Sequence, residues 1–551
     1  MIPLSEMTLS GLCLRSAEKY TKRPALGMFK EGALCSPVNY RLLGIRSRQI
    51  GSLLGQLGIQ AGDRVLLLSE NRPEWPLAYF GIAFAGAVSV PALTGFSSRQ
   101  IQNICEHAGV SAICLSRAMA AKIETSAVPL IFIDSITNGS TADGTSAHIT
   151  VSLNGTEKDL SLRASGSGFP RRSADDIASI IYTSGTLGNS KGVMLSSRNL
   201  VSCALASLSL VTIFPRDRLL SVIPLAHAYE CTLGLLAAVI SGASITYLDR
   251  PPSPSVLLPA AQALRPTAMV TVPLFIEKIY RNTIAPKLKQ SILYRFPLTR
   301  PLAFHFAGLR LGSALGGSIR FFGIGGAPLS AEVEDFLHKI RFPYAPGYGL
   351  TETAPLTAGT APYRFSRRSA GSAPAGVELR ITDGEIQVRG PHVMMGYYRD
   401  EAQTREAFTA DGWLKTGDLG CLDKKGRLFV KGRLKALILG PSGENIYPEE
   451  IEGLLNTSNL VEDALVYPGE QGELIAQIHI SETAKVLFQT AANAAITALE
   501  DLRAWANKRL AAFSRLSRIE LREEPFEKTP THKIKRYLYV RPCGESLPAA
   551  R

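Results

Sequence analysis

The sequence lacks the cysteine patterns of metal-binding and disulfide-stabilised proteins. Its eight cysteines are spread over 551 residues and form no Cys-x-x-Cys pair and no compact cluster with histidine. Zinc sites, dithiol redox centres and disulfide scaffolds all need such groupings. We therefore expect reduced, mostly buried thiols that serve only packing.

Long apolar runs and an export signal are also missing. The two most apolar stretches, Gly81–Val90 and Leu233–Ile245, are shorter than the roughly 20 residues of a membrane-spanning helix. The N-terminus has no basic start followed by an apolar stretch, and Glu6 lies where a signal peptide would be apolar. These features predict a cytoplasmic protein.

The composition is that of a globular protein, because 46% of the residues are apolar and only 19% are charged. Its length predicts two or three hydrophobic cores. A helix is expected over Leu42–Leu57 and a strand over Arg64–Ser69, while residues 135–174 indicate an irregular or hairpin-rich connection. Further buried strands are expected at Ile177–Tyr182, Ser244–Leu248, Ala268–Val272 and Ile319–Ile324. This alternation favours an α/β fold with layered subdomains.

A change in charge divides the chain near Arg433. From that residue to the end there are 15 basic and 16 acidic residues, which leaves 45 and 31 before it. The turn-rich stretch Asp411–Gly432 precedes this point. We predict a large N-terminal domain over residues 1–432 and a small α+β domain over residues 436–551.

Basic residues are concentrated between Arg265 and Arg320, where nine Lys and Arg accompany a single acid, Glu277. Aromatic residues lie among them. The segment suits an anionic membrane surface, where each cation is worth about 1 kcal/mol, but a solvated basic face over a substrate tunnel has the same composition. Nucleic acid is not an expected partner, because no nucleic-acid-binding motif accompanies the charge.

The stretch Ile181–Met194 is rich in small hydroxyl and glycine residues and follows a predicted strand. Such residues let backbone amides approach phosphate oxygens, and Lys191 adds a cation. The Gly-Lys-Ser/Thr ending of a Walker A loop is absent. The stretch alone indicates either a phosphate-binding loop or a flexible turn.

This stretch resembles the phosphate loop of the acyl-adenylate-forming superfamily, and further blocks of that family follow in order. They are Pro224-Leu-Ala-His-Ala-Tyr-Glu230, Gly325-Gly-Ala-Pro-Leu-Ser330, Gly347-Tyr-Gly-Leu-Thr-Glu-Thr353, Thr416-Gly-Asp-Leu-Gly420, Lys431-Gly-Arg-Leu-Lys435 and Lys528-Thr-Pro-Thr-His-Lys-Ile-Lys-Arg536. The ordered set covers most of the chain and is far more specific than any member. The phrasing around His227, residues 315–330 and Lys533 is similar to the long-chain fatty acyl-CoA synthetase branch.

The resemblance implies a site for ATP and Mg²⁺. Glu352 takes the metal position, Thr351 offers a hydroxyl to the α-phosphate, and Asp418 accepts from the ribose hydroxyls beside Arg433. The other implied nucleotide-binding residues are Thr183, Ser184, Gly185, Thr186, Gly188 and Lys191 at the phosphates, with Gly325, Gly326, Ala327, Pro328, Tyr348 and Gly349 around the base.

The resemblance also implies two half-reactions at one site. Lys533 is the expected catalytic cation for adenylate formation, and His227 shapes the carboxylate pocket. Residues 433–435 form the hinge, centred on Lys435, about which the mobile small domain swings. The swing brings a thiol-tunnel loop of Gly443, Glu444 and Asn445 to the site.

The implied reaction joins a fatty acid to coenzyme A through acyl-AMP. Two alternatives stay open: an acyl carrier protein as the thiol, or a catalytically reduced protein that binds adenylates or senses acyl groups. Leu187, Ser190 and His532 depart from the usual family residues, which bears on loop rigidity and pyrophosphate handling. Binding at an inner membrane surface through residues 265–320 is a further expectation.

Overall fold

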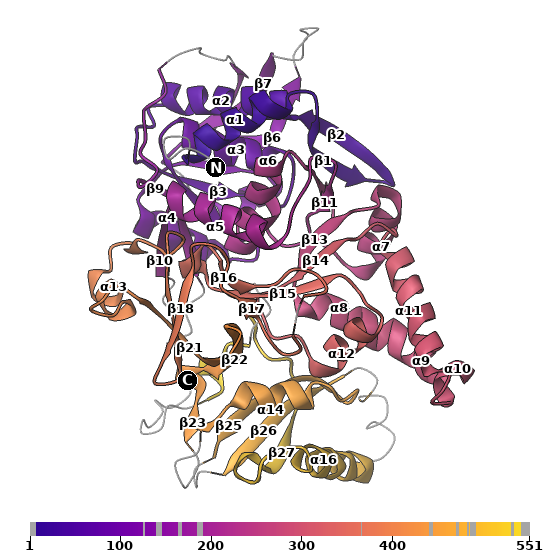
Figure 1. Ribbon diagram of the computed structural model, residues 1–551. Coiled ribbons are helices and arrows are strands. Elements are labelled where there is room, and N and C mark those ends of the chain that lie inside the picture. The colour runs from indigo at the N-terminus through magenta and orange to yellow at the C-terminus, as the bar shows by residue number, and fades with distance from the viewer. Residues whose placement is uncertain are drawn as a thin grey trace.

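The computed structural model describes residues 7–124, 127–138, 146–162, 168–183, 191–364, 366–439, 445–469, 473–481, 484, 492–529 and 534–540. These residues form a mixed α/β structure with two large sheets and a smaller unit at the C-terminal end (Figure 1). The helices cover the sheets, and the smaller unit lies at the bottom of the view in orange and yellow.

The larger sheet has 13 strands in the order β18-β19-β21-β22-β17-β16-β15-β14-β13-β11-β12-β1-β2. Its middle is parallel from β1 to β15, and antiparallel strands extend it beyond β15. The strands are β1 Pro24–Lys30, β2 Ala33–Asn39, β11 Arg218–Leu220, β12 Ser244–Leu248, β13 Ala268–Thr271, β14 Phe321–Ile324, β15 Tyr344–Gly349, β16 Leu356–Gly359, β17 Gly371–Ser372, β18 Glu378–Thr382, β19 Glu385–Arg389, β21 Leu414–Leu422 and β22 Arg427–Arg433.

The second sheet has nine strands in the order β20-β10-β9-β4-β3-β5-β6-β7-β8. Its parallel core is buried on both faces, as the continuous apolar runs predict. The strands are β3 Arg64–Leu68, β4 Val88–Ala92, β5 Val110–Leu115, β6 Leu130–Asn138, β7 Ala147–Leu153, β8 Thr156–Leu162, β9 Ile177–Thr183, β10 Lys191–Ser196 and β20 Gly396–Tyr397.

The smaller unit has its own apolar cluster, which runs from Ile438 to Leu516. One three-stranded sheet and one two-stranded sheet surround it together with α14 and α16. The strands are β23 Ile438–Leu439, β24 Asn445–Ile446, β25 Val461–Pro468, β26 Leu474–Ile480 and β27 Leu516–Arg522. The separate cluster fits a small α+β unit, while the boundary at residue 432 and the unit's mobility stay predictions.

Local sequence signals set several helix ends. Ser196 Oγ accepts a hydrogen bond from the backbone N–H of Asn199, and Asn199 Oδ1 accepts one from the backbone N–H of Ser196, so α5 begins directly after β10. The helices are α1 Leu9–Tyr20, α2 Tyr40–Gln56, α3 Glu74–Phe84, α4 Ser98–Ala108, α5 Ser197–Leu210, α6 Ala237–Ser241, α7 Pro254–Leu264, α8 Pro273–Ile279, α9 Ala285–Gln290, α10 Ile292–Arg295, α11 Arg300–Ala314, α12 Ala331–Lys339, α13 Glu401–Ala407, α14 Pro448–Leu455 and α16 Ala492–Asn507.

Two π-helical segments, η3 (Glu230–Leu236) and η4 (Tyr280–Ile284), interrupt this helical set. Segments of 3₁₀ helix join several elements: η2 Arg117–Lys122, η5 Thr351–Thr353, η6 Leu434–Ala436, η7 Ala512–Ser514 and η8 Arg536–Leu538. None of the described helices is long and apolar enough to cross a membrane.

The α/β prediction is confirmed. The predicted helix at residues 42–57 and the strands at 64–69, 177–182 and 244–248 are present within a few residues. Residues 135–174 contain the antiparallel strands β7 and β8, as a hairpin-rich connection predicts. The stretch Asp411–Gly432, which its composition marks as turn-rich, holds most of two long paired strands, β21 and β22.

Candidate active site

Three predicted nucleotide-binding residues from β15, β21 and β22 meet in the antiparallel part of the larger sheet. Asp418 on β21 and Arg433 on β22 are opposite each other in the ladder, and Arg433 Nε lies 2.8 Å from Asp418 Oδ1. Tyr348 on β15 donates its hydroxyl hydrogen to Asp418 Oδ2 at 2.6 Å. The carboxylate therefore links three strands.

Burial decides the charges in this group. Asp418 is 4% exposed. Burial and the neighbouring Asp418 carboxylate raise the pKa of Tyr348 far above its ordinary value, so its hydroxyl stays a donor. Partial loss of solvent acts against the charge of Arg433, whose side chain is still 45% exposed, and the attraction of Asp418 leaves the pKa of the guanidinium raised. The site therefore holds a carboxylate anion, Asp418, and a guanidinium cation, Arg433, beside the Tyr348 ring.

Glu352 lies next to this group on the η5 turn, which directly follows β15. Its Oε1 accepts a hydrogen bond of 3.0 Å from the hydroxyl of Tyr397 on β20. Its carboxylate also raises the pKa of Arg433. Thr351 is half-buried on the same turn. The two sheets thus meet at Glu352.

Lys191 extends the site from the second sheet. It is the first residue of β10, pairs across the ladder with Thr183 at the end of β9, and places its ammonium 4.6 Å from the centre of the Tyr397 ring. Ser184, Gly185, Thr186, Gly188, Leu187 and Ser190 lie outside the described residues. The two ends of the predicted phosphate loop are therefore held together by strand pairing.

The predicted base-binding loop follows β14 and lies against Tyr229. Gly325 is buried, whereas Gly326, Ala327 and Pro328 are exposed. A side chain at Gly325 would place its Cβ 3.2 Å from the Tyr229 ring. His227 Nδ1 accepts from the backbone N–H of Tyr229 at 3.2 Å. His227 and the loop are thus connected through one aromatic residue.

Gly349 shows why the turn into η5 needs glycine. A Cβ at this position would lie 1.6 Å from the carbonyl oxygen of Pro355. This distance is far inside any allowed contact with backbone. Close packing at Gly349 therefore fixes the path between Tyr348 and Glu352.

The remaining predicted residues belong to the hinge, the thiol-tunnel loop and the C-terminal lysine segment. Lys533 and His532, together with Gly443 and Glu444 of the thiol-tunnel loop, are not among the described residues. Lys435 lies on the η6 turn after β22, and Asn445 begins β24. Their roles stay predictions.

Sequence reasoning missed Tyr397 and the environment of Glu230. A hydrogen bond between residues 45 positions apart leaves no local signal. Glu230 was noted only as the end of a motif, yet its carboxyl is 1% exposed and burial raises its pKa to about 8. The only sequence signal for this buried acid is its position at the start of the apolar stretch that forms the π-helical segment η3.

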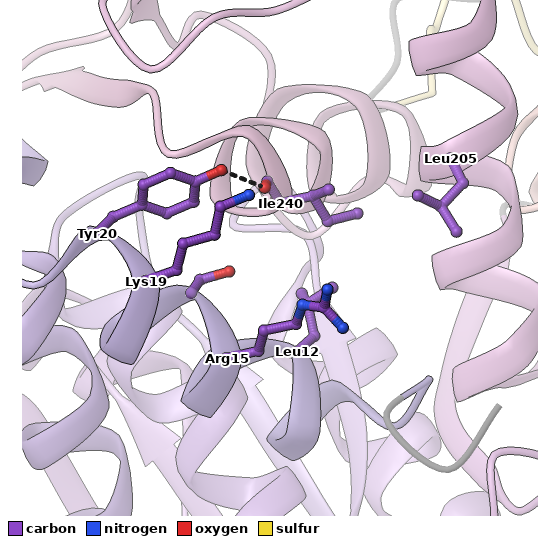
Figure 2. Close-up of a pocket in the computed structure, with 7 residues that line it drawn as sticks. Leu12, Arg15, Lys19, Tyr20, Leu205 and Ile240 are labelled. Atoms are coloured by element: carbon purple, nitrogen blue, oxygen red, sulfur yellow. Dashed lines mark hydrogen bonds between the residues drawn. The ribbon is translucent and has the colours of Figure 1, made fainter. Parts of the chain in front are cut away.

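A separate small pocket, of about 180 Å³, lies between α1, α5 and α6. Figure 2 shows Arg15 and Lys19 at this pocket, with Leu12, Leu205 and Ile240 around it and the Tyr20 hydroxyl bonded to the Ile240 carbonyl. None of the predicted site residues lines it.

Glu352 fits the magnesium position that the sequence predicts. Mg²⁺ in nucleotide enzymes is held by one or two carboxylates together with substrate phosphates. Among the described residues, Glu352 accepts a side-chain hydrogen bond at Oε1, from Tyr397, and a carboxylate held through one oxygen can bind a metal through the other. No cluster of three or more metal-ligating side chains occurs among the described residues, so such an ion would depend on the phosphates.

Solved structures share this architecture. ATP-bound MatB from Rhodopseudomonas palustris has a TM-score of 0.74 at 24% identity, over 96% of this chain and 98% of that one. MenE from Bacillus subtilis with ATP and magnesium has a TM-score of 0.72 at 23% identity, over 96% and 98%. The fold is therefore that of adenylate-forming enzymes.

Residues 13–398 match the family described as AMP-binding enzyme. This match spans well over half of the chain, and the protein belongs to that family. The resemblance to the acyl-adenylate-forming superfamily is thereby confirmed, as is the prediction of an AMP-forming ligase.

Named relatives fall into two groups. Long-chain-fatty-acid–CoA ligase FadD15 of Mycobacterium tuberculosis is 32% identical over 77% of this chain and 73% of its own length. Peroxisomal long chain acyl-CoA synthetase 7 of Arabidopsis thaliana is 31% identical over 84% and 71%. The 4-coumarate–CoA ligase of Vanilla planifolia is 27% identical over 98% and 95%.

Proposed function

We propose that this protein activates a long-chain fatty acid with ATP and transfers the acyl group to coenzyme A. The Asp418 carboxylate, bonded to Tyr348 and Arg433 beside Glu352, is the single observation that carries the adenylation chemistry. The acyl preference is supported by the long-chain phrasing of the motifs around His227 and Lys533 and by two long-chain relatives at 31–32% identity over 84% and 77% of this chain. The 4-coumarate ligase, at 27% identity over 98% of this chain, represents the competing class of acid.

In the first half-reaction a carboxylate oxygen attacks the α-phosphorus, and the bond to pyrophosphate breaks. The Tyr348 ring offers a face to adenine and Asp418 accepts from the ribose hydroxyls. Lys191 lies at the phosphate end, and Glu352 would hold Mg²⁺, which when bound offsets phosphate charge. Lys533 stabilises the charge that develops between the carboxylate and the phosphate.

In the second half-reaction a thiolate sulfur attacks the acyl carbonyl, and AMP leaves with the bonding electron pair. The swing about Lys435 removes Lys533 and brings Gly443, Glu444 and Asn445 to the site. His227 and Tyr229 lie near the base-binding loop and shape the pocket for the reacting carboxylate.

An acyl carrier protein is the alternative thiol, because its phosphopantetheine arm has the same reacting end as coenzyme A. A catalytically reduced protein that binds adenylates is the alternative from another class. We also propose that the enzyme works at a cytoplasmic membrane surface through residues 265–320, because long fatty acids partition into membranes.

A panel of acids from short to very long, crossed with coenzyme A and acyl carrier protein, tests the function. We expect pyrophosphate exchange into ATP to rise with long-chain acids, and thioester to form with coenzyme A. Exchange with 4-coumarate but not with fatty acids would overturn the acyl assignment. No exchange with any acid would favour the adenylate-binding alternative.

A further inference from the structure

We propose that α10, the turn after it and the outer face of α11 form a docking ridge that inserts into the surface of an anionic lipid bilayer. The docking ridge is defined by six exposed apolar side chains: Ile292, Phe296, Leu298, Leu302, Phe306 and Leu309. This inference deepens the proposed membrane contact and needs no particular acyl chain length.

The exposure of the ridge is unusual for this molecule. Leu298 is 95% exposed and Ile292 is 73% exposed. Among the described residues 17 large apolar side chains are exposed, and six of them fall within the 18 positions from 292 to 309. Contiguous apolar surface of this kind marks interaction sites, whereas scattered apolar residues do not.

Packing on the inner side of α10 and α11 supports the docking ridge. Leu302, Phe306 and Leu309 share one face of α11, while Ala303 and Leu311 are buried on the other side. Behind the ridge, Phe304 packs between Tyr294 and Phe336, with ring centres 5.8 and 6.3 Å away. Tyr280 also contacts Phe336, at 4.9 Å. These inward-facing rings anchor α10 and α11, the helices that carry the exposed side chains.

This arrangement narrows the expectation drawn from the sequence. Four of the six aromatic residues in the basic segment lie in the core or pack against it, so they cannot meet a membrane: Phe275, Tyr280, Tyr294 and Phe304. Arg320, at the end of that segment, pairs with the buried Asp217. The surface available to a partner therefore centres on residues 287–310. Figure 1 places α9, α10 and α11 at the outer right edge, with α10 at the tip.

Charge selects an anionic partner. No acidic residue occurs between Glu277 and Glu332. Exposed cations border the ridge, and in the part of the chain that the structure describes none of these four has an ion-pair partner: Lys287, Lys289, Arg295 and Arg310. Cations around apolar side chains match a bilayer whose headgroups are negative and whose interior is apolar.

A lipid surface fits better than the other partners. Nucleic acid would be contacted by the cations but would leave Leu298 and Ile292 in water. A second copy of this chain would place two basic surfaces against each other. Only the bilayer uses both the apolar tip and the surrounding charge.

Flotation of the full-length protein with vesicles tests the proposal without measuring thioester formation. We expect binding to vesicles of phosphatidylcholine mixed with phosphatidylglycerol at low salt, and little binding to phosphatidylcholine alone. Lys287→Glu with Lys289→Glu should weaken partitioning by about thirtyfold or more, given the typical contribution of each cation. Phe296→Ser with Leu298→Ser should weaken it about 100-fold or more if both side chains enter the apolar part of the bilayer.

Matched controls lie on other surfaces. Leu34→Ser removes a 54% exposed leucine on β2, and Lys424→Glu with Lys425→Glu reverses two exposed cations in the β21–β22 turn. Neither control should change vesicle binding. All variants should keep the thermal midpoint and pyrophosphate exchange with a water-soluble acid, which separates this proposal from the proposed function.

Three results would overturn the proposal that the docking ridge binds a bilayer. The first is no flotation of the wild-type protein at low salt, and the second is equal loss of binding in the controls. The third is binding to duplex DNA or self-association that the ridge variants abolish while vesicles bind nothing.

Discussion

Asp418 holds three strands together through two hydrogen-bonded partners, so its charge matters to both structure and ligand. Asp418→Asn keeps the shape and removes the charge. Because hydrogen bonds to charged groups are worth about 1.5–3 kcal/mol, we expect ATP to bind roughly 10- to 100-fold more weakly. Isothermal titration calorimetry of the variant with ATP measures this.

The same hairpin provides a control for that change. Asp423 pairs with Arg427 in the turn between β21 and β22, at 2.6 Å. Asp423→Asn removes an ion pair of the same kind away from Tyr348 and should leave ATP affinity unchanged. Tyr348→Phe keeps the ring and loses the bond to Asp418, so a smaller loss is expected. Normal ATP affinity in Asp418→Asn would contradict the assigned site.

Glu230 should make the stability of the protein depend on pH. Burial raises its pKa from 4.5 to about 8, so the folded protein binds a proton that the unfolded chain releases at lower pH. Its contribution to stability is complete below pH 4.5 and is lost as the pH rises through about 8. At about 1.4 kcal/mol per pKa unit, the loss is on the order of 5 kcal/mol.

Glu230→Gln should remove this dependence, because the amide stays neutral. We expect the thermal midpoint of the wild type to fall from pH 6 to pH 9 by more than that of the variant. Glu106→Gln, a change on the exposed end of α4, should behave like the wild type. The same fall in all three proteins would show that Glu230 does not carry the effect.

At the scale of elements, the turn from β15 into η5 depends on one glycine. Gly349→Ala would force a Cβ against the Pro355 carbonyl, so the backbone between Tyr348 and Glu352 must move. Overpacking of this kind typically costs about 1–3 kcal/mol. We expect a lower thermal midpoint and loss of ATP binding. Gly453→Ala, on α14 with open space around the added Cβ, should stay as stable as the wild type or gain slightly.

The sequence predicted elements with a local signal and missed those set by distant contacts. Short apolar runs such as residues 177–182 and 244–248 became strands because they are buried on both faces. The strands β21 and β22 escaped prediction because glycines and charges punctuate them, and their pairing depends on contacts such as Asp418 with Arg433. Tyr397 was missed for the same reason. Motif order identified most site residues, but the spacing of motifs carries no information on which side chains meet.

At the scale of the whole molecule, we propose that the two large sheets bind the nucleotide and that the smaller unit supplies the mobile catalytic lysine. The sheets bring Lys191, Glu352 and Asp418 to one place from separate elements. The smaller unit carries the segment with Lys533 and follows the Lys435 turn. In the proposed cycle, one cation must therefore serve adenylate formation and be absent during thioester formation.

Separate assay of the two half-reactions in Lys533→Ala tests this central claim most directly. Lys535→Ala is the control, because Lys535 follows two positions later in the sequence and its ammonium lies 3.0 Å from the Glu527 carboxylate. We predict that Lys533→Ala slows acyl-AMP formation by about 100-fold or more and largely spares thioester formation from supplied acyl-AMP, while Lys535→Ala changes neither. An equal loss of both half-reactions in Lys533→Ala, or full activity in adenylate formation, would contradict the account.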